Sequence, residues 1–116
     1  YAVEAFAEIP WLRTRPCHFW GDLDTHGFAI LNRLRHHLPD VRSLLMDQQT
    51  LFAHEPLWQQ EDKPALGLLD RLNDAEQGVY QGLQNDRWGD RVRLEQERIG
   101  WDYAWKRVEH LARHSR

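Results

Sequence analysis

Asp22 and Asp24 are the residues whose chemical type and spacing best suit a reaction site. Carboxylates two positions apart at the end of a strand can converge on one hard cation, because the chain there leaves the alternation of the pleat. Mg²⁺, or Mn²⁺ in its place, suits them because it prefers oxygen ligands, including phosphate oxygens of a substrate. Gly27 lacks a side chain and would let a phosphate approach the loop. His26 could reach the same phosphate or pack near an aromatic ring.

Two other interpretations of this acidic loop stay open. The carboxylates can form a turn and a helix cap, which acidic residues before helices often do. The Asp-Leu-Asp-Thr run is also similar to that of phosphatases and phosphomutases whose first aspartate is a covalent nucleophile. Those enzymes have Thr or Val where this chain has His26, and they need a downstream lysine, whereas Lys63 is expected in a loop and Lys106 in the last helix. The phosphatase interpretation therefore comes second.

The residues around the acidic loop predict the elements that position it. Residues 17–21 form a compact apolar and aromatic run flanked by turn residues, which is typical of a buried strand. Residues 28–38 place their apolar side chains on one broad helical face, and residues 41–46 indicate a second strand. Strand, loop, helix and strand make a βαβ unit, which implies a parallel sheet. The acidic loop then lies at the carboxyl end of a strand, where ligands gather in open α/β sheets.

Beyond this unit, helix signals alternate with loops. We expect helices over residues 2–12 and 47–54, a surface loop over 55–66, and an extended segment over 92–99. Asn73 and Glu76 have the spacing of a capping box, which predicts a helix over residues 74–83.

The last helix has the clearest apolar stripe, formed by Trp101, Ala104, Trp105, Val108, Leu111 and Ala112. We expect Trp101 and Trp105 in the core because they lie on this stripe. Trp20, within the first predicted strand, is expected in the core as well.

Three further acidic residues could support the site. Asp47 follows the second predicted strand on the same sheet edge as the acidic loop, although capping of the next helix is its favoured role. Glu95 and Glu97 share a face in an extended segment and could support a metal ion. Salt bridges to Arg93 and Arg98 are the favoured alternative for these two glutamates.

The composition limits the class of protein. A chain of 116 residues that is 41% hydrophobic and 28% charged suits one small domain with one core. The absence of a long apolar run and of a signal-peptide pattern indicates a cytoplasmic protein without membrane contact. The single cysteine, Cys17, permits no internal disulfide and is expected to pack in the core. With a net charge of -3 at pH 7, nucleic-acid binding would need a local basic patch.

A longer set of residues resembles one family. The matching segments are FWGDLDTHGF at residues 19–28, then Ile30, Leu31, Leu34 and Arg35, SLLMD at residues 43–47, and RLEQERI at residues 93–99. Together they are similar to the C-terminal domain of the nuclease subunit of the Wadjet anti-plasmid defence system, the JetD family, from about Val3 to Ala112. The segments are long and in order, so chance is a poor explanation of the match.

The resemblance implies an α/β fold with a Toprim-like parallel-sheet core and flanking helices, related to the A subunit of topoisomerase VI. In that family an Asp-x-Asp-x-x-Gly loop binds Mg²⁺ for DNA cleavage, and Asp22, Asp24 and Gly27 match it, with Thr25 where relatives commonly have proline. The implied function is the metal-binding portion of a Mg²⁺-dependent endonuclease. The implied partners are double-stranded DNA and the subunits of a condensin-like ATPase complex, and a homodimer is compatible with the family.

One departure from the family pattern concerns a catalytic glutamate. Toprim domains carry it at the end of an earlier strand, whereas only 21 residues precede Asp22 here, and Glu4 and Glu8 fall in the predicted helix after that strand. We therefore expect residues 1–116 to be a single partial Toprim-like domain that lacks its first strand, binds Mg²⁺ weakly and does not cut DNA alone. A non-catalytic partner-binding fragment is the alternative.

Contact with DNA would depend on local basic side chains, since the net charge is negative. The candidates are Arg33, Arg35, His36 and His37 on the face of the helix over residues 28–38 that we expect to be exposed, and Arg91, Arg93 and Arg98 near the extended segment. A solvated surface face is the more frequent role of such residues.

Overall fold

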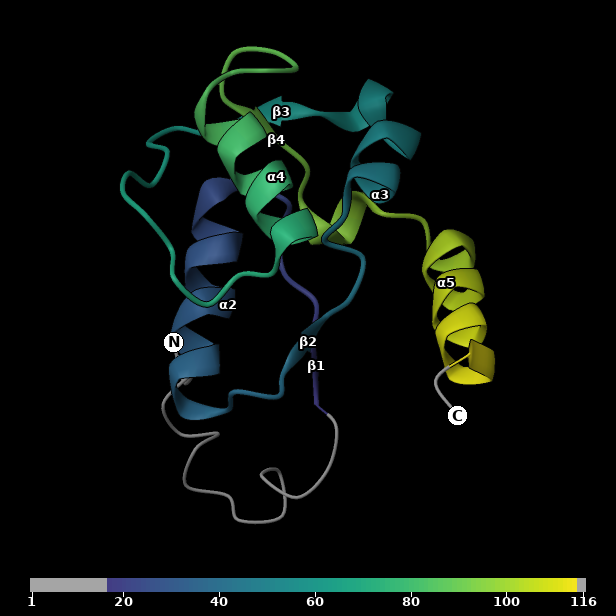
Figure 1. Cartoon of the computed structure of the whole chain (residues 1–116). Helices are drawn as coiled ribbons and strands as arrows, with labels where there is room; N and C mark the ends of the chain where they lie inside the picture. Colours follow the sequence, from purple (N-terminus) through teal and green to yellow (C-terminus); the bar gives the residue numbers. More distant parts are fainter. Residues whose placement is uncertain (1–16, 115–116) are drawn as a thin grey trace.

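The computed structural model describes residues 17–114 and shows short strands flanked by helices (Figure 1). Along the chain the elements are β1 (His18–Phe19), α2 (Thr25–His37), β2 (Arg42–Ser43), α3 (Gln48–Ala53), a 3₁₀ helix (Glu55–Leu57), β3 (Gln59–Gln60), α4 (Asp74–Gln84), β4 (Val92–Arg93), a second 3₁₀ helix (Gln96–Arg98) and α5 (Trp101–His114). The predicted helix over residues 2–12, with Glu4 and Glu8, lies outside the described residues. Within the described part, the fold is a mixed α/β arrangement.

The predicted βαβ unit is present. β1 and β2 pair in parallel, with His18 opposite Arg42, and α2 connects them. Both strands are shorter than predicted. Leu45, with a positive φ of 61°, turns the chain after β2 toward α3. α2 starts at Thr25, earlier than predicted, because the Asp24 side chain caps its first turn.

A second pairing was not foreseen. β3 and β4 are antiparallel, with Gln59 opposite Arg93, so the prediction of a surface loop over residues 55–66 is wrong in its middle. An isolated antiparallel bridge between Leu23 and Leu94 links this pair to the chain just after β1. The segment around β4 therefore lies between the acidic loop and β3.

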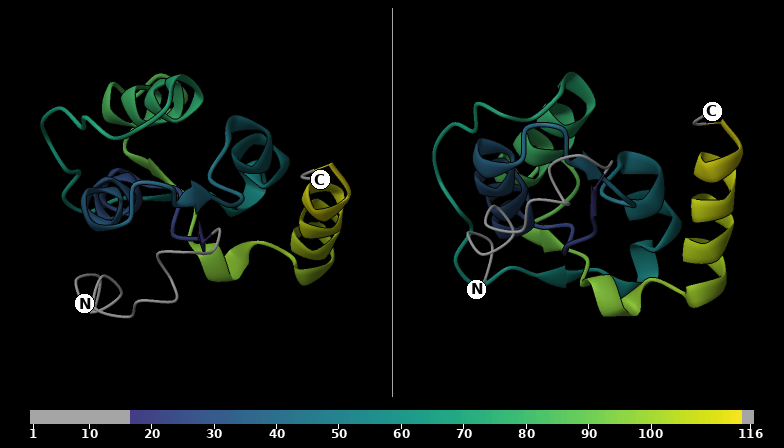
Figure 2. Two further views of the ribbon diagram at one scale, coloured as in Figure 1. Left: turned by 60° about the horizontal axis from the view of Figure 1, so that its bottom comes forward. Right: turned by 90° about the horizontal axis from the view of Figure 1, so that it is seen from below.

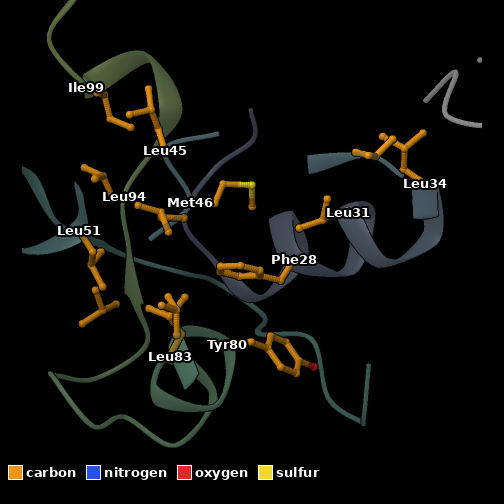
Figure 3. Packing of buried hydrophobic residues seen from close by; sticks show 14 of the residues in the cluster. Phe28, Leu31, Leu34, Leu45, Met46, Leu51, Tyr80, Leu83, Leu94 and Ile99 are labelled. Carbon is orange, nitrogen blue, oxygen red and sulfur yellow. The ribbon is translucent and has the colours of Figure 1, made fainter. Parts of the chain in front are cut away.

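The core lies between α2, α4 and the strands (Figure 3). Phe28 of α2 meets Tyr80 of α4 in an edge-to-face contact with ring centroids 6.3 Å apart. Leu31 and Leu94 are completely buried in the same cluster. Cys17 packs against this cluster, as expected, and is a free cysteine.

Arg35 belongs to the fold's internal framework. Its guanidinium forms two hydrogen bonds with Glu76, at 2.5 and 2.9 Å, and donates to the carbonyl oxygens of Val41 and Arg71. Glu76 also closes the predicted capping box of α4 with Asn73. The prediction that Arg35 is exposed and available to DNA is wrong, because α2 turns this side chain toward α4, where it is 8% exposed.

The last helix, α5, lies beside α3 at one side of the molecule (Figure 2). It is anchored by Arg107, which donates to Asp47 at 2.6 Å, and by the buried Ala104. Trp101 and Trp105 are 72% and 55% exposed, so their predicted place in the core is wrong. Arg107 and Ala104 are on the side of α5 that contacts the rest of the domain, and the two tryptophans are on the exposed side. The side chains of residues 111 and 112 lie outside the described part.

Two smaller observations complete the fold. Trp20 is only partly buried and packs against the edge of the core. Among the described residues, none of the helices combines the length and apolar character that crossing a bilayer requires.

Candidate functional site

A hollow of about 430 Å³ opens where the chain leaves β1. Its wall is mostly charged or aromatic, with Trp20, Asp22, Asp24, Glu61 and Arg93 among the lining residues. The two sequence-predicted aspartates therefore lie together in one concave site.

The two carboxylate oxygens of Asp24 contact different groups. Oδ1 accepts a hydrogen bond from the Gly27 amide at 2.6 Å and caps α2. Oδ2 lies 2.9 Å from Nε of Arg93. Burial raises the pKa of Asp24 to about 6, while the Gly27 amide and the Arg93 charge act in the opposite direction. The helix-cap interpretation of Asp24 is thus correct, and its second carboxylate oxygen contacts the guanidinium of Arg93.

Asp22 is arranged in the same way. Its Oδ1 accepts from the Gln96 amide at 2.7 Å, and its Oδ2 lies 3.3 Å from Nη2 of Arg93. One oxygen of each aspartate therefore faces the same guanidinium. The two carboxylates converge on one cation, an arginine of the same protein, while the binding of a metal ion by them stays a prediction.

The register of the Leu23–Leu94 bridge explains why Arg93 is that cation. The two residues exchange backbone hydrogen bonds at 2.9 and 3.1 Å, and both side chains are completely buried. Because side chains alternate across extended chains, their neighbours turn the opposite way. Asp24 and Arg93 are directly adjacent in this register, and both face the hollow.

Glu61 is a site residue that sequence reasoning missed. It is 3% exposed, and its carboxylate accepts hydrogen bonds from the Thr25 hydroxyl at 2.6 Å and from the Thr25 and His26 amides at 3.3 Å. The β3–β4 pairing brings it there, since its own amide donates to the Arg91 carbonyl at 2.7 Å. The Gln59–Gln60 strand has no apolar alternation, so hydrophobic periodicity could not have found it.

Gly27 and His26 occupy the first turn of α2. A Cβ on Gly27 would overlap the Asp22 carbonyl oxygen, so glycine is required by the close approach of the chain to itself. His26 is exposed at the rim of the hollow, where its Nε2 lies 2.5 Å from the Lys63 carbonyl oxygen. Since a carbonyl only accepts, Nε2 is the donor in this contact.

The family described as Wadjet protein JetD, C-terminal, matches residues 1–108. The chain belongs to this family. The matched residues include the whole acidic loop, Glu61 and Arg93, and they reach into α5. The comparison with curated proteins gave no match. The resemblance found from the sequence motifs is confirmed, and with it the connection to the Wadjet defence system.

The remaining acidic candidates lie at the edge of the hollow or elsewhere in this member of the JetD family. Asp47 caps α3 through the Thr50 amide, at 2.8 Å, and lines a separate hollow, so its favoured role as a cap is confirmed. Glu95 pairs with Arg98 at 3.6 Å, as favoured, whereas Arg93 pairs with the aspartates instead. Glu97 is exposed in the 3₁₀ helix and does not line the hollow.

The basic candidates differ in their exposure and in their ion pairs. Arg33 lies on an exposed part of α2, and Arg98 is exposed next to Glu95. His36 contacts Asp70 at 3.0 Å, and Arg91 lies 3.5 Å from Asp90. Arg33 and Arg98 are therefore the accessible arginines among those proposed to contact DNA.

The hollow of this JetD-family chain offers carboxylate oxygens, which are the donors that Mg²⁺ prefers. Within the described part of the chain, no group of three or more histidine, cysteine, aspartate or glutamate side chains is arranged to hold a metal ion. Mg²⁺, however, is usually held by one or two carboxylates and keeps several waters. Asp22 and Asp24 already share a cation, so they fit such an ion at the place of the guanidinium.

Proposed function

We propose that this domain is the metal-binding portion of a Mg²⁺-dependent DNA endonuclease that acts in Wadjet defence against plasmids. The observation that carries the proposal is the convergence of the Asp22 and Asp24 Oδ2 atoms on one cation. Membership of the JetD family supports the connection to plasmid defence. The position of the acidic loop after a parallel strand supports a Toprim-like core.

Each group has a role in this proposal. Asp22 and Asp24 hold the divalent ion, which when bound offsets the charge that grows on a scissile phosphate. Glu61 fixes the start of α2, and thereby the position of Asp24, through its three hydrogen bonds. Arg33 and Arg98 bind phosphates of double-stranded DNA. Subunits of a condensin-like ATPase complex are the proposed protein partners.

Calorimetric titration with Mn²⁺ tests the metal site. The wild-type chain should bind Mn²⁺ weakly, and the double variant Asp22→Asn with Asp24→Asn should lose the binding heat. Asp47→Asn is the matched control, because it removes the same charge from a carboxylate outside the hollow. Binding heat that survives in the double variant contradicts the proposal and favours a non-catalytic partner-binding domain.

The same variants test whether the chain cuts DNA by itself. We expect no nicking of supercoiled DNA by the 116-residue chain, because only two of the carboxylates that line the hollow, those of Asp22 and Asp24, converge on one cation position. Mn²⁺-dependent nicking that Asp22→Ala abolishes would contradict this expectation and would show that two carboxylates suffice.

One observation favours a second candidate function. Lys63 lines the same hollow as Asp22, and a downstream lysine is one of the groups that a phosphatase with an aspartate nucleophile needs. Such an enzyme would hydrolyse a small ester such as p-nitrophenyl phosphate, and both Asp22→Asn and Lys63→Met would abolish turnover. The endonuclease proposal predicts no turnover of this ester by the wild-type chain.

A further inference from the structure

The guanidinium of Arg93 occupies the place where a metal ion would meet the two aspartates. Its Nε lies 2.9 Å from Asp24 and its Nη2 lies 3.3 Å from Asp22. A divalent ion cannot approach the same two oxygens while this positive group lies between them, because both charge and volume oppose it.

The contacts of Arg93 are poorly directed. Although Nε is close to Asp24, the geometry does not make a hydrogen bond, and this buried nitrogen has no other partner. The contact to Asp22 is longer than a typical charge-assisted hydrogen bond. Arg93 is thus held mainly by charge.

Arg35 shows what a permanent arginine looks like in the same fold. Its guanidinium makes two hydrogen bonds to one carboxylate and two to backbone carbonyls, and its side chain is 10% exposed. The Arg93 side chain is 33% exposed and has no comparable set of bonds. It therefore has both a weaker attachment and a route to solvent.

The side chains that line the hollow carry a net negative charge, which favours a cation of higher charge than a guanidinium. Four carboxylates, those of Asp22, Asp24, Glu61 and Asp62, line the hollow together with Arg93. One guanidinium offsets only part of that negative charge, even with Lys63 at the rim. A divalent ion bound by the two aspartates in place of Arg93 would offset more of this negative charge than a single guanidinium does.

We infer that Arg93 is an exchangeable internal cation, which holds Asp22 and Asp24 together in the metal-free domain and must be displaced for a divalent ion to bind. The inference rests on the proposed function and adds a control of metal entry to it. Metal affinity is then set by competition with a side chain of the same protein.

Calorimetric titration of Mn²⁺ into Arg93→Gln tests this directly. Removal of the competing charge should tighten Mn²⁺ binding by about tenfold or more. Arg98→Gln is the matched control, since Arg98 pairs with Glu95 outside the hollow, and it should bind like the wild type. Equal or weaker binding by Arg93→Gln overturns the inference, while loss of binding in the double aspartate variant would still uphold the metal site. No binding by either the wild type or Arg93→Gln overturns both.

A second measurement uses the wild-type chain and does not depend on how the variant folds. The NMR resonance of the Arg93 Nε–H group should move to the position of a solvated arginine when Mg²⁺ is added, while that of Arg35 stays in place. An Arg93 resonance that does not move while Mg²⁺ binds overturns the inference.

Discussion

Leu23 and Leu94 form an antiparallel bridge that connects the acidic loop to the segment after β4. Both leucines are completely buried, so the bridge fixes which side chains on either side face the hollow. A shift of this register by one residue would turn Arg93 toward the core and a leucine toward the aspartates. The same backbone contact thus specifies the fold and the composition of the site.

Shortening a leucine side chain of the Leu23–Leu94 bridge should destabilise the domain. Leu94→Ala removes a completely buried side chain, and we expect a loss of about 2–4 kcal/mol in the free energy of unfolding, measured with urea. Leu66→Ala is the control, because Leu66 is 87% exposed and should change stability by less than about 0.5 kcal/mol. Similar losses in both variants would contradict the central place of Leu94 in the core.

The Arg35–Glu76 pair should matter more than any surface pair. Glu76→Gln keeps the capping box and leaves the buried Arg35 charge uncompensated, which should cost about 3 kcal/mol in urea unfolding. His36→Gln, which removes an exposed contact with Asp70, should have little effect. A Glu76→Gln variant as stable as the wild type would show that the pair contributes nothing.

The same carboxylate predicts an acid-dependent loss of stability. Burial acts to raise the pKa of Glu76, yet hydrogen bonds from Arg35 and Ser43 prevail and hold it below the usual value of 4.5. A carboxyl group with a lowered pKa binds its proton less tightly when folded, so its stabilisation is lost as the pH falls below about 4.5. Glu76→Gln should lack this loss in unfolding experiments at pH 3 to 5. An identical pH dependence in the variant would contradict the assignment.

Asp24 should show the opposite dependence. Its pKa of about 6 in the folded protein exceeds the ordinary value of 3.8, so the folded state binds this proton more tightly. The contribution of Asp24 to stability therefore decreases as the pH rises from about 4 to about 6, by about 1–3 kcal/mol. Asp24→Asn, which can still cap α2, should remove this slope. NMR of the carboxyl carbon in the metal-free protein should show the titration directly, and an Asp24 pKa near 4 would contradict the prediction.

Much of this fold follows from local patterns. The apolar face over residues 28–38 predicted α2, and Asn73 with Glu76 predicted the start of α4. The spacing of Asp22 and Asp24 predicted that they would lie together, as they do, although the cation that they share is Arg93 and not the predicted metal ion. These features depend on residues close together in the sequence, where periodicity and capping rules apply directly.

The features that were missed depend on distant pairings. The β3–β4 pair, which brings Glu61 to the site, joins a short polar strand to one more than thirty residues later. The apolar pattern of residues 28–38 leaves Arg35 on the face predicted to be exposed, and only the position of Glu76 shows that α2 turns it inward. Helix α5 is present as predicted, but Trp101 and Trp105 are exposed. The side of a terminal helix that is buried depends on contacts with distant residues, such as that of Arg107 with Asp47.

The most direct measurement of the central claim is the location of bound Mn²⁺ by paramagnetic broadening of NMR signals from the wild-type chain. We predict that the backbone amide signals of Leu23, Thr25 and Gly27 broaden first, because these residues surround Asp22 and Asp24. The signal of Thr50, beside the Asp47 carboxylate, should persist to higher Mn²⁺ concentrations. Broadening that starts at Thr50, or that shows no preference for the acidic loop, would contradict the assignment of the metal site.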